Sequence, residues 1–221
     1  MVRRETQNYP KHQPLSVQTK LEEQLNTFSH AIGAVLGIVG LIILVSKQVN
    51  APWSLFSVLV YGLSIIVLFS ASTLYHAAKT EKRKHYFRIV DHISIYLLIA
   101  GTYTPVLLLT LSDSKGWPLF YTVWGIAAFG VFLKLFFTGR FEVFSTLLYL
   151  VMGWLIVFDF SVLAERMDTN GLLFLFAGGL FYTVGIVFYA INKIPYNHVI
   201  WHVFVLAGAI SHYFMILWFV V

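Results

Sequence analysis

The sequence predicts an all-α polytopic membrane protein, a bundle of seven transmembrane helices, from its composition and its charge pattern. Of the 221 residues, 58% are hydrophobic and only 11% are charged, whereas a soluble globular chain carries about 25% charged residues. The few charges also fall into clusters that long uncharged intervals separate. Such a chain cannot cover a water-facing surface, so the composition excludes a soluble enzyme or a soluble binding domain.

The uncharged intervals mark the helices in order, because a transmembrane helix needs about 20 apolar residues. The first four intervals contain 23, 31, 21 and 18 residues; they follow Glu23, Lys47, Asp91 and Lys115. The fifth contains 22 residues with one acid, Asp159, and the last two contain 24 and 28. The sequence therefore predicts helices near 27–46, 53–75, 89–110, 117–138, 143–163, 171–191 and 198–220.

The helices leave room only for short loops, so residues 27–221 are predicted to form one seven-helix transmembrane domain. Residues 1–26 are polar and lack the apolar core of a cleavable signal peptide, which predicts a cytoplasmic N-terminal tail. The chain contains no cysteine, which excludes disulfides and thiolate metal sites.

The positive charges predict the orientation, because lysine and arginine are enriched in cytoplasmic loops. Twelve of the fifteen lie in the tail and in the second, fourth and sixth connections. The N-terminus is therefore expected in the cytoplasm and the C-terminus outside, in a multi-pass protein of the plasma membrane. This distribution explains the net charge of +5, so the lipid bilayer is the expected partner and nucleic acid is not. The last span also contains no lysine, which excludes a retinal Schiff base.

Two histidines at the start of the seventh helix have the spacing of metal ligands. His198 and His202 are four residues apart, so they lie on one helical face with their Cβ atoms about 5–6 Å apart. Two imidazoles at that separation can share one metal ion.

Their depth in the membrane matches that of two further ionisable residues. His76 ends the second helix and Asp91 opens the third, each three residues from the nearest cation of the basic connection between them. Ser72 lies one turn before His76 on the same face. Three neutral imidazoles and a water form an open catalytic zinc site. The alternative is a set of unrelated interfacial residues that anchor helix ends.

Three other polar residues in the spans have simpler interpretations. His30 is expected at the interfacial start of the first helix, with a contact to the site as the alternative. Asp159 lies near the outer end of the fifth helix, where it is expected to reach the lipid headgroups. His212 is about 15 Å outward from His202, which favours a helix–helix hydrogen bond.

These motifs together resemble the bacterial haemolysin III family, which is related to the adiponectin and progestin receptors and to alkaline ceramidases. The resemblance covers S-T-L-Y-H at Ser72–His76, the acid at Asp91, H-V-I-W-H at His198–His202, E-E-Q-L-N-T-F-S-H at Glu22–His30 and G-T-Y-T-P at Gly101–Pro105. It implies a seven-helix bundle in which His76, His198 and His202 bind zinc. It also implies that Asp91 contacts the metal through water, with Ser72 beside it.

Three functions remain open at this point. The first is a zinc-dependent hydrolase of amide or ester lipids in the inner leaflet, with Asp91 and Ser72 as the catalytic residues. The second is a haemolysin-type pore-forming protein, and the third is a sensor of membrane lipid composition that zinc stabilises. The sequence does not distinguish catalytic from structural zinc, because the fourth ligand is not encoded.

The charge distribution makes a prediction about topology. A reporter fused after Val221 should be active only outside the cytoplasm, and one placed between Lys79 and Arg88 only inside it. Two reporters, one active only in the cytoplasm and one active only outside it, fused at each position measure the compartment of that position. A cytoplasmic C-terminus would mean an even number of spans and would distribute the four polar positions over both leaflets.

Overall fold

Seven segments of the described chain are long and apolar enough to cross a membrane as helices. A helix satisfies its backbone hydrogen bonds internally, as the lipid core requires. The structure, a computed structural model, describes residues 18–221, so residues 1–17 of the expected tail lie outside the described residues. The helices are α1 (Lys20–Lys47), α2 (Ser54–Ala77), α3 (Glu81–Pro105) with its π-helical continuation η1 (Val106–Thr110), α4 (Gly116–Phe137), α5 (Glu142–Gly153), the 3-10 helix η2 (Leu155–Asp159), α6 (Phe160–Arg166), α7 (Thr169–Ala190) and α8 (Asn197–Phe219).

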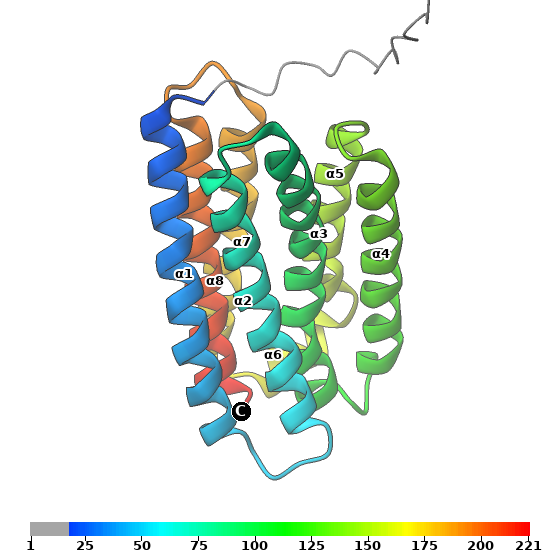
Figure 1. Ribbon diagram of the computed structural model, residues 1–221. Helices are drawn as coiled ribbons and strands as arrows, with labels where there is room; N and C mark the ends of the chain where they lie inside the picture. Colours follow the sequence, from blue (N-terminus) through cyan, green and yellow to red (C-terminus); the bar gives the residue numbers. More distant parts are fainter. Residues whose placement is uncertain (1–17) are drawn as a thin grey trace, which may run out of the picture.

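The spans alternate in direction, and the last helix returns to the first (Figure 1). α8 packs against both α7 and α1, while α2 packs against α1 and α3. The loops 78–80, 138–141 and 191–196 lie at the same end of the bundle as the start of α1, and Val221 lies at the opposite end. We call the end that contains these three loops the basic end, because it contains most of the lysine and arginine residues of the loops.

α1 packs closely against its two neighbours, α2 and α8. A Cβ atom at Gly37 would lie 2.8 Å from the side chain of Ile65 on α2, and one at Gly40 would lie 2.8 Å from the Tyr213 ring on α8. The hydroxyl of Tyr213 also donates a hydrogen bond of 3.1 Å to the carbonyl of Gly40. Small residues permit this close approach of helices in membranes, so the first and last spans lie side by side.

The seven predicted spans are confirmed, but two of them begin earlier than expected. α1 begins at Lys20 instead of 27, and α3 at Glu81 instead of 89. Thr19 and Glu22 form a capping box at the start of α1, with bonds of 3.2 and 2.7 Å between side chains and backbone amides. Thr80 caps α3 in a similar way. Charge-delimited intervals miss these polar first turns because capping and tertiary contacts, not hydropathy, hold them helical.

The fifth span is interrupted where the sequence predicts one continuous helix. The Tyr103 hydroxyl of α3 donates to the carbonyl of Gly153 at 2.9 Å and accepts from the backbone amide of Ile156 at 3.0 Å. A side chain that inserts into the hydrogen-bond ladder of a helix is a common cause of a break. The span therefore divides into α5, η2 and α6.

Asp159 stabilises the end of that break, and the expectation that it reaches the headgroups is wrong. Its side chain is buried, and it accepts hydrogen bonds of 3.0 Å from the Ser114 hydroxyl and from the Lys115 backbone amide. The carboxylate thereby joins η2 to the loop between η1 and α4. The cost of burying a carboxylate is offset by these two donors.

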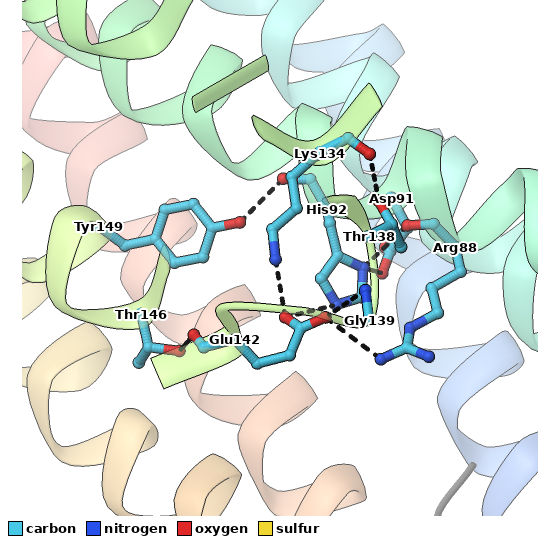
Figure 2. A network of polar contacts seen from close by, with 9 residues as sticks. All are labelled: Arg88, Asp91, His92, Lys134, Thr138, Gly139, Glu142, Thr146 and Tyr149. Carbon is cyan, nitrogen blue, oxygen red and sulfur yellow. Dashed lines mark hydrogen bonds and ion pairs between the residues drawn. The ribbon is translucent and has the colours of Figure 1, made fainter. Parts of the chain in front are cut away.

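A partly buried ionic network joins α3, α4 and α5 at the basic end (Figure 2). Glu142, at the start of α5, accepts from the Lys134 ammonium of α4 at 2.7 Å and from the Arg88 guanidinium of α3 at 3.3 Å. It also accepts from the Gly139 backbone amide at 3.0 Å. The Lys134 side chain is only 1% exposed, so its charge depends on this one carboxylate.

Glu142→Gln should therefore destabilise the bundle, because it leaves the buried Lys134 without an anionic partner. Breaking a buried ion pair costs on the order of 3 kcal/mol, which corresponds to a fall in Tm of about 6–12 °C for a chain of this length. Thermal unfolding of the purified protein in detergent measures the change. The control Glu165→Gln alters an exposed carboxylate of the same span and should shift Tm by less than about 2 °C. Equal Tm values for the two variants would show that the network contributes little.

Candidate metal centre

Three histidines from two helices converge inside the basic end of the bundle. His76 is the penultimate residue of α2, whereas His198 and His202 belong to the first two turns of α8. One ligand atom of each lies within 4.8 Å of the others. The His76 ring centroid is 5.2 Å from that of His198 and 4.7 Å from that of His202. The three imidazoles form a group that can hold a metal ion.

The environment of these rings fits a metal with nitrogen ligands. His76 and His202 are buried, with His76 Nε2 and His202 Nδ1 lacking any hydrogen-bond partner. An unsatisfied polar atom in a protein interior demands an explanation such as a bound ion or water. Nitrogen atoms that share one tetrahedral zinc lie about 3.4 Å apart, and the three ligand atoms here lie within 4.8 Å of one another. Imidazole ligands suit zinc, copper, iron and nickel.

Asp91 and Ser72 lie beside this group. The Asp91 carboxylate on α3 is close enough to the Ser72 hydroxyl and to His76 to interact with both, and its side chain is 16% exposed. Among the described residues, the ligand atoms that lie within 4.8 Å of one another come from the three histidines, and Asp91 does not belong to this set. The structure thus brings the three predicted metal ligands together, and Asp91 with Ser72 is a neighbour of His76.

His92 is not among the three histidines of the group, and its side chain contacts a different set of residues. Its Nδ1–H donates to the Arg88 carbonyl at 2.8 Å, and its Nε2 lies 3.9 Å from the Glu142 carboxylate (Figure 2). The Tyr149 hydroxyl of α5 donates to the His92 carbonyl at 3.0 Å. His92 therefore connects the helix turn that contains Asp91 with the ionic network around Glu142.

Glu23 on α1 contacts the site, although it is not among the site residues predicted from the sequence. Its Oε2 accepts a hydrogen bond of 2.7 Å from His76 Nδ1, and its Oε1 accepts one from the Lys84 ammonium. The expected start of the first helix at residue 27 placed Glu23 in the tail, outside any span. The capping-box pattern of Thr19 and Glu22 was the available signal, because it moves the helix start upstream of Glu23.

His30 and Asn26 continue the same face of α1 into the site. The His30 ring stacks on that of His202 with 3.7 Å between centroids, and neither of its nitrogens has a partner. Asn26 is fully buried, and its Oδ1 is also unpartnered. The expectation that His30 lies at an interfacial helix start is wrong, and the alternative contact with the site is correct. Helical periodicity places residues 23, 26 and 30 on one face.

The prediction for His212 is confirmed near the opposite end of the bundle. Its Nε2–H donates to the Leu175 carbonyl of α7 at 3.1 Å. The ring also lines a cavity of about 210 Å³ between η2 and α7, together with Trp154, Val157, Phe160 and Phe176. The lining is largely apolar, and the side chain of His212 has a structural partner.

Comparison with known proteins identifies relatives along nearly the whole described chain. The family model described as Haemolysin-III related matches residues 18–213. The chain is 45% identical to Hemolysin-3 of Bacillus cereus over 202 residues, which cover 90% of this chain and 92% of that protein. It is 41% identical to the Hemolysin-3 homolog of Bacillus subtilis (strain 168), with 90% and 95% covered.

A human protein is similar over a region of comparable length. Monocyte to macrophage differentiation factor of Homo sapiens is 31% identical over 204 residues, which cover 90% of this chain and 84% of that protein. The region that the family model matches contains every helix from α1 to α7 and most of α8.

Proposed function

Because this chain belongs to the haemolysin III family and is a multi-pass protein of the cell membrane, we propose that it is a zinc-dependent lipid hydrolase. His76, His198 and His202 bind one zinc ion, and the reaction cleaves an amide or ester bond of a lipid in the inner leaflet. The single observation that supports this proposal is the convergence of three imidazoles, two of them with an unpartnered buried nitrogen.

Asp91 and Ser72 supply the groups that the reaction needs beside the metal. When bound, a zinc ion with three imidazole ligands lowers the pKa of a coordinated water towards about 7. Asp91 accepts the proton of the attacking water as general base. The new bond joins the water oxygen to the carbonyl carbon, the C–N or C–O bond breaks, and the Asp91 proton passes to the leaving group. Ser72 orients the Asp91 carboxylate through its hydroxyl.

The depth of the site fits a lipid substrate. His202 is the sixth residue of α8, so it lies about 7.5 Å along the axis from the start of that helix. A scissile bond at this depth lies just below the headgroups of the leaflet at the basic end. The orientation predicted from the positive charges makes this the inner leaflet. An acyl chain would then extend from the site into the bilayer.

The two alternatives make different demands on the same bundle. The name Hemolysin-3 belongs to the Bacillus cereus relative, and a pore within one copy would need a polar path from end to end. In the described helices the middle of the bundle is packed with apolar and aromatic side chains such as Leu68, Tyr96 and Val205, which argues against such a path. A zinc-stabilised lipid sensor would bind the metal without hydrolysis.

Substitutions at Asp91 and His76 separate catalysis from metal binding. Asp91→Asn should retain most of the zinc and lose hydrolysis by about 10²–10⁴-fold, the usual contribution of a general base. His76→Ala should lose zinc and activity together, and should also lower Tm, because metal binding free energy stabilises the folded state. Zinc content by atomic absorption and turnover of a long-chain amide lipid in proteoliposomes measure both effects.

Asp168→Asn is the matched control, because asparagine replaces aspartate well at the N-cap of α7. It should change neither zinc content nor turnover. If Asp91→Asn loses zinc as completely as His76→Ala, Asp91 is a direct fourth ligand and the site is a closed structural one. Zinc binding without turnover of amide or ester lipids would favour the sensor. Membrane lysis that persists after zinc removal would favour the pore.

A further inference from the structure

We propose that Glu23 of α1 is a positioning residue of the metal centre, which orients His76 and strengthens it as a ligand through the hydrogen bond to Nδ1. This inference rests on the proposed zinc site. It adds a third helix to a centre whose ligands come from α2 and α8, and it assigns a role to a carboxylate outside the predicted set of site residues.

The geometry of His76 supports this role. A carboxylate accepts hydrogen bonds, so the contact of 2.7 Å between Glu23 Oε2 and His76 Nδ1 requires a proton on Nδ1. The neutral ring then carries its lone pair on Nε2, the nitrogen that is buried and has no partner. The hydrogen bond thus fixes both the tautomer and the direction of the lone pair.

His76 needs such support more than the other two ligands do. His198 and His202 share one helix, and their i, i+4 spacing alone places them on the same face. His76 is the ligand that α2 contributes, and it lies at the last turn of that helix. Without a partner on Nδ1, no hydrogen bond would fix the tautomer or the orientation of the ring. In metalloproteins a carboxylate on the second imidazole nitrogen fixes both and raises ligand basicity.

The second oxygen of Glu23 has a separate partner. Lys84 on α3 donates to Oε1, so the carboxylate bridges α2 and α3 from α1. The Glu23 and Lys84 side chains are 20% and 21% exposed, which places this ion pair towards the surface of the basic end. A simpler interpretation is that Glu23 serves only this helix–helix ion pair. The two interpretations differ in their consequences for metal affinity.

Zinc affinity of the purified full-length protein, measured by competition with a chelator in detergent micelles, tests the proposal. Glu23→Gln keeps the size of the side chain and removes its charge, and the Kd for zinc should rise about 10–100-fold. Lys84→Gln removes the ion pair and leaves the carboxylate on His76, so the Kd should rise less than about fivefold. Glu22→Gln is the control on the same helical turn; glutamine retains the cap acceptor there, and the Kd should not change.

Each outcome has a distinct meaning. Wild-type protein that binds no zinc would overturn the proposed function together with this inference. Zinc binding by the wild type with an unchanged Kd in Glu23→Gln would overturn the inference alone, whatever the change in Tm. Equal effects of Glu23→Gln and Lys84→Gln on Kd would assign the role to the ion pair and would also overturn it.

A measurement on the wild type does not depend on how the variants fold. In ¹⁵N-histidine protein loaded with ¹¹³Cd, the His76 ring should show a proton on Nδ1 and metal coupling to Nε2. Assignment uses the loss of the signal in His76→Gln. Metal coupling to Nδ1 would contradict the proposed role of Glu23, because one nitrogen cannot both donate to the carboxylate and bind the metal.

Discussion

A polar side chain inside a membrane bundle has no water to bond, so its partner must come from the protein or from a ligand. Tyr103, Asp159 and His212 satisfy this constraint through partners on other segments. Among the described residues, nine buried polar side-chain atoms have no partner, and five of these belong to Asn26, His30, His76 and His202. This concentration at one place distinguishes the candidate metal centre from ordinary helix-to-helix hydrogen bonding, and it is the basis of the proposed chemistry.

The ionic groups at the basic end organise the surroundings of this centre. Glu142 neutralises the buried Lys134, and His92 lies between that network and Asp91. Glu23 contacts both His76 and Lys84. Two carboxylates on different helices therefore hold the helices of the basic end together: Glu142 joins α3 and α4 to α5, and Glu23 joins α1 to α2 and α3. A metal site with such support is held by contacts beyond its ligands.

The spacing of charges was sufficient to predict seven spans and their limits at most ends, because hydropathy decides which residues cross a lipid core. It was insufficient for α1 and α3, where Thr19 and Thr80 cap polar turns beyond that core. The distance from the basic loops was sufficient to predict a shared depth for His76, Asp91, His198 and His202, with Ser72 one helical turn away. Glu23 and His30 were not predicted as site residues because their contacts depend on how α1 packs. The break after Gly153 was not predicted because it depends on Tyr103 of another helix.

The central claim is that one zinc ion joins α2 to α8 through three imidazoles. X-ray absorption at the zinc edge of the purified full-length protein tests this most directly. We expect a first shell at about 2.0–2.1 Å with the multiple scattering of about three imidazole rings and one additional oxygen. His198→Ala should remove one imidazole from that shell or abolish binding. A shell of oxygen atoms without imidazole scattering, or the same spectrum in His198→Ala, would contradict the claim.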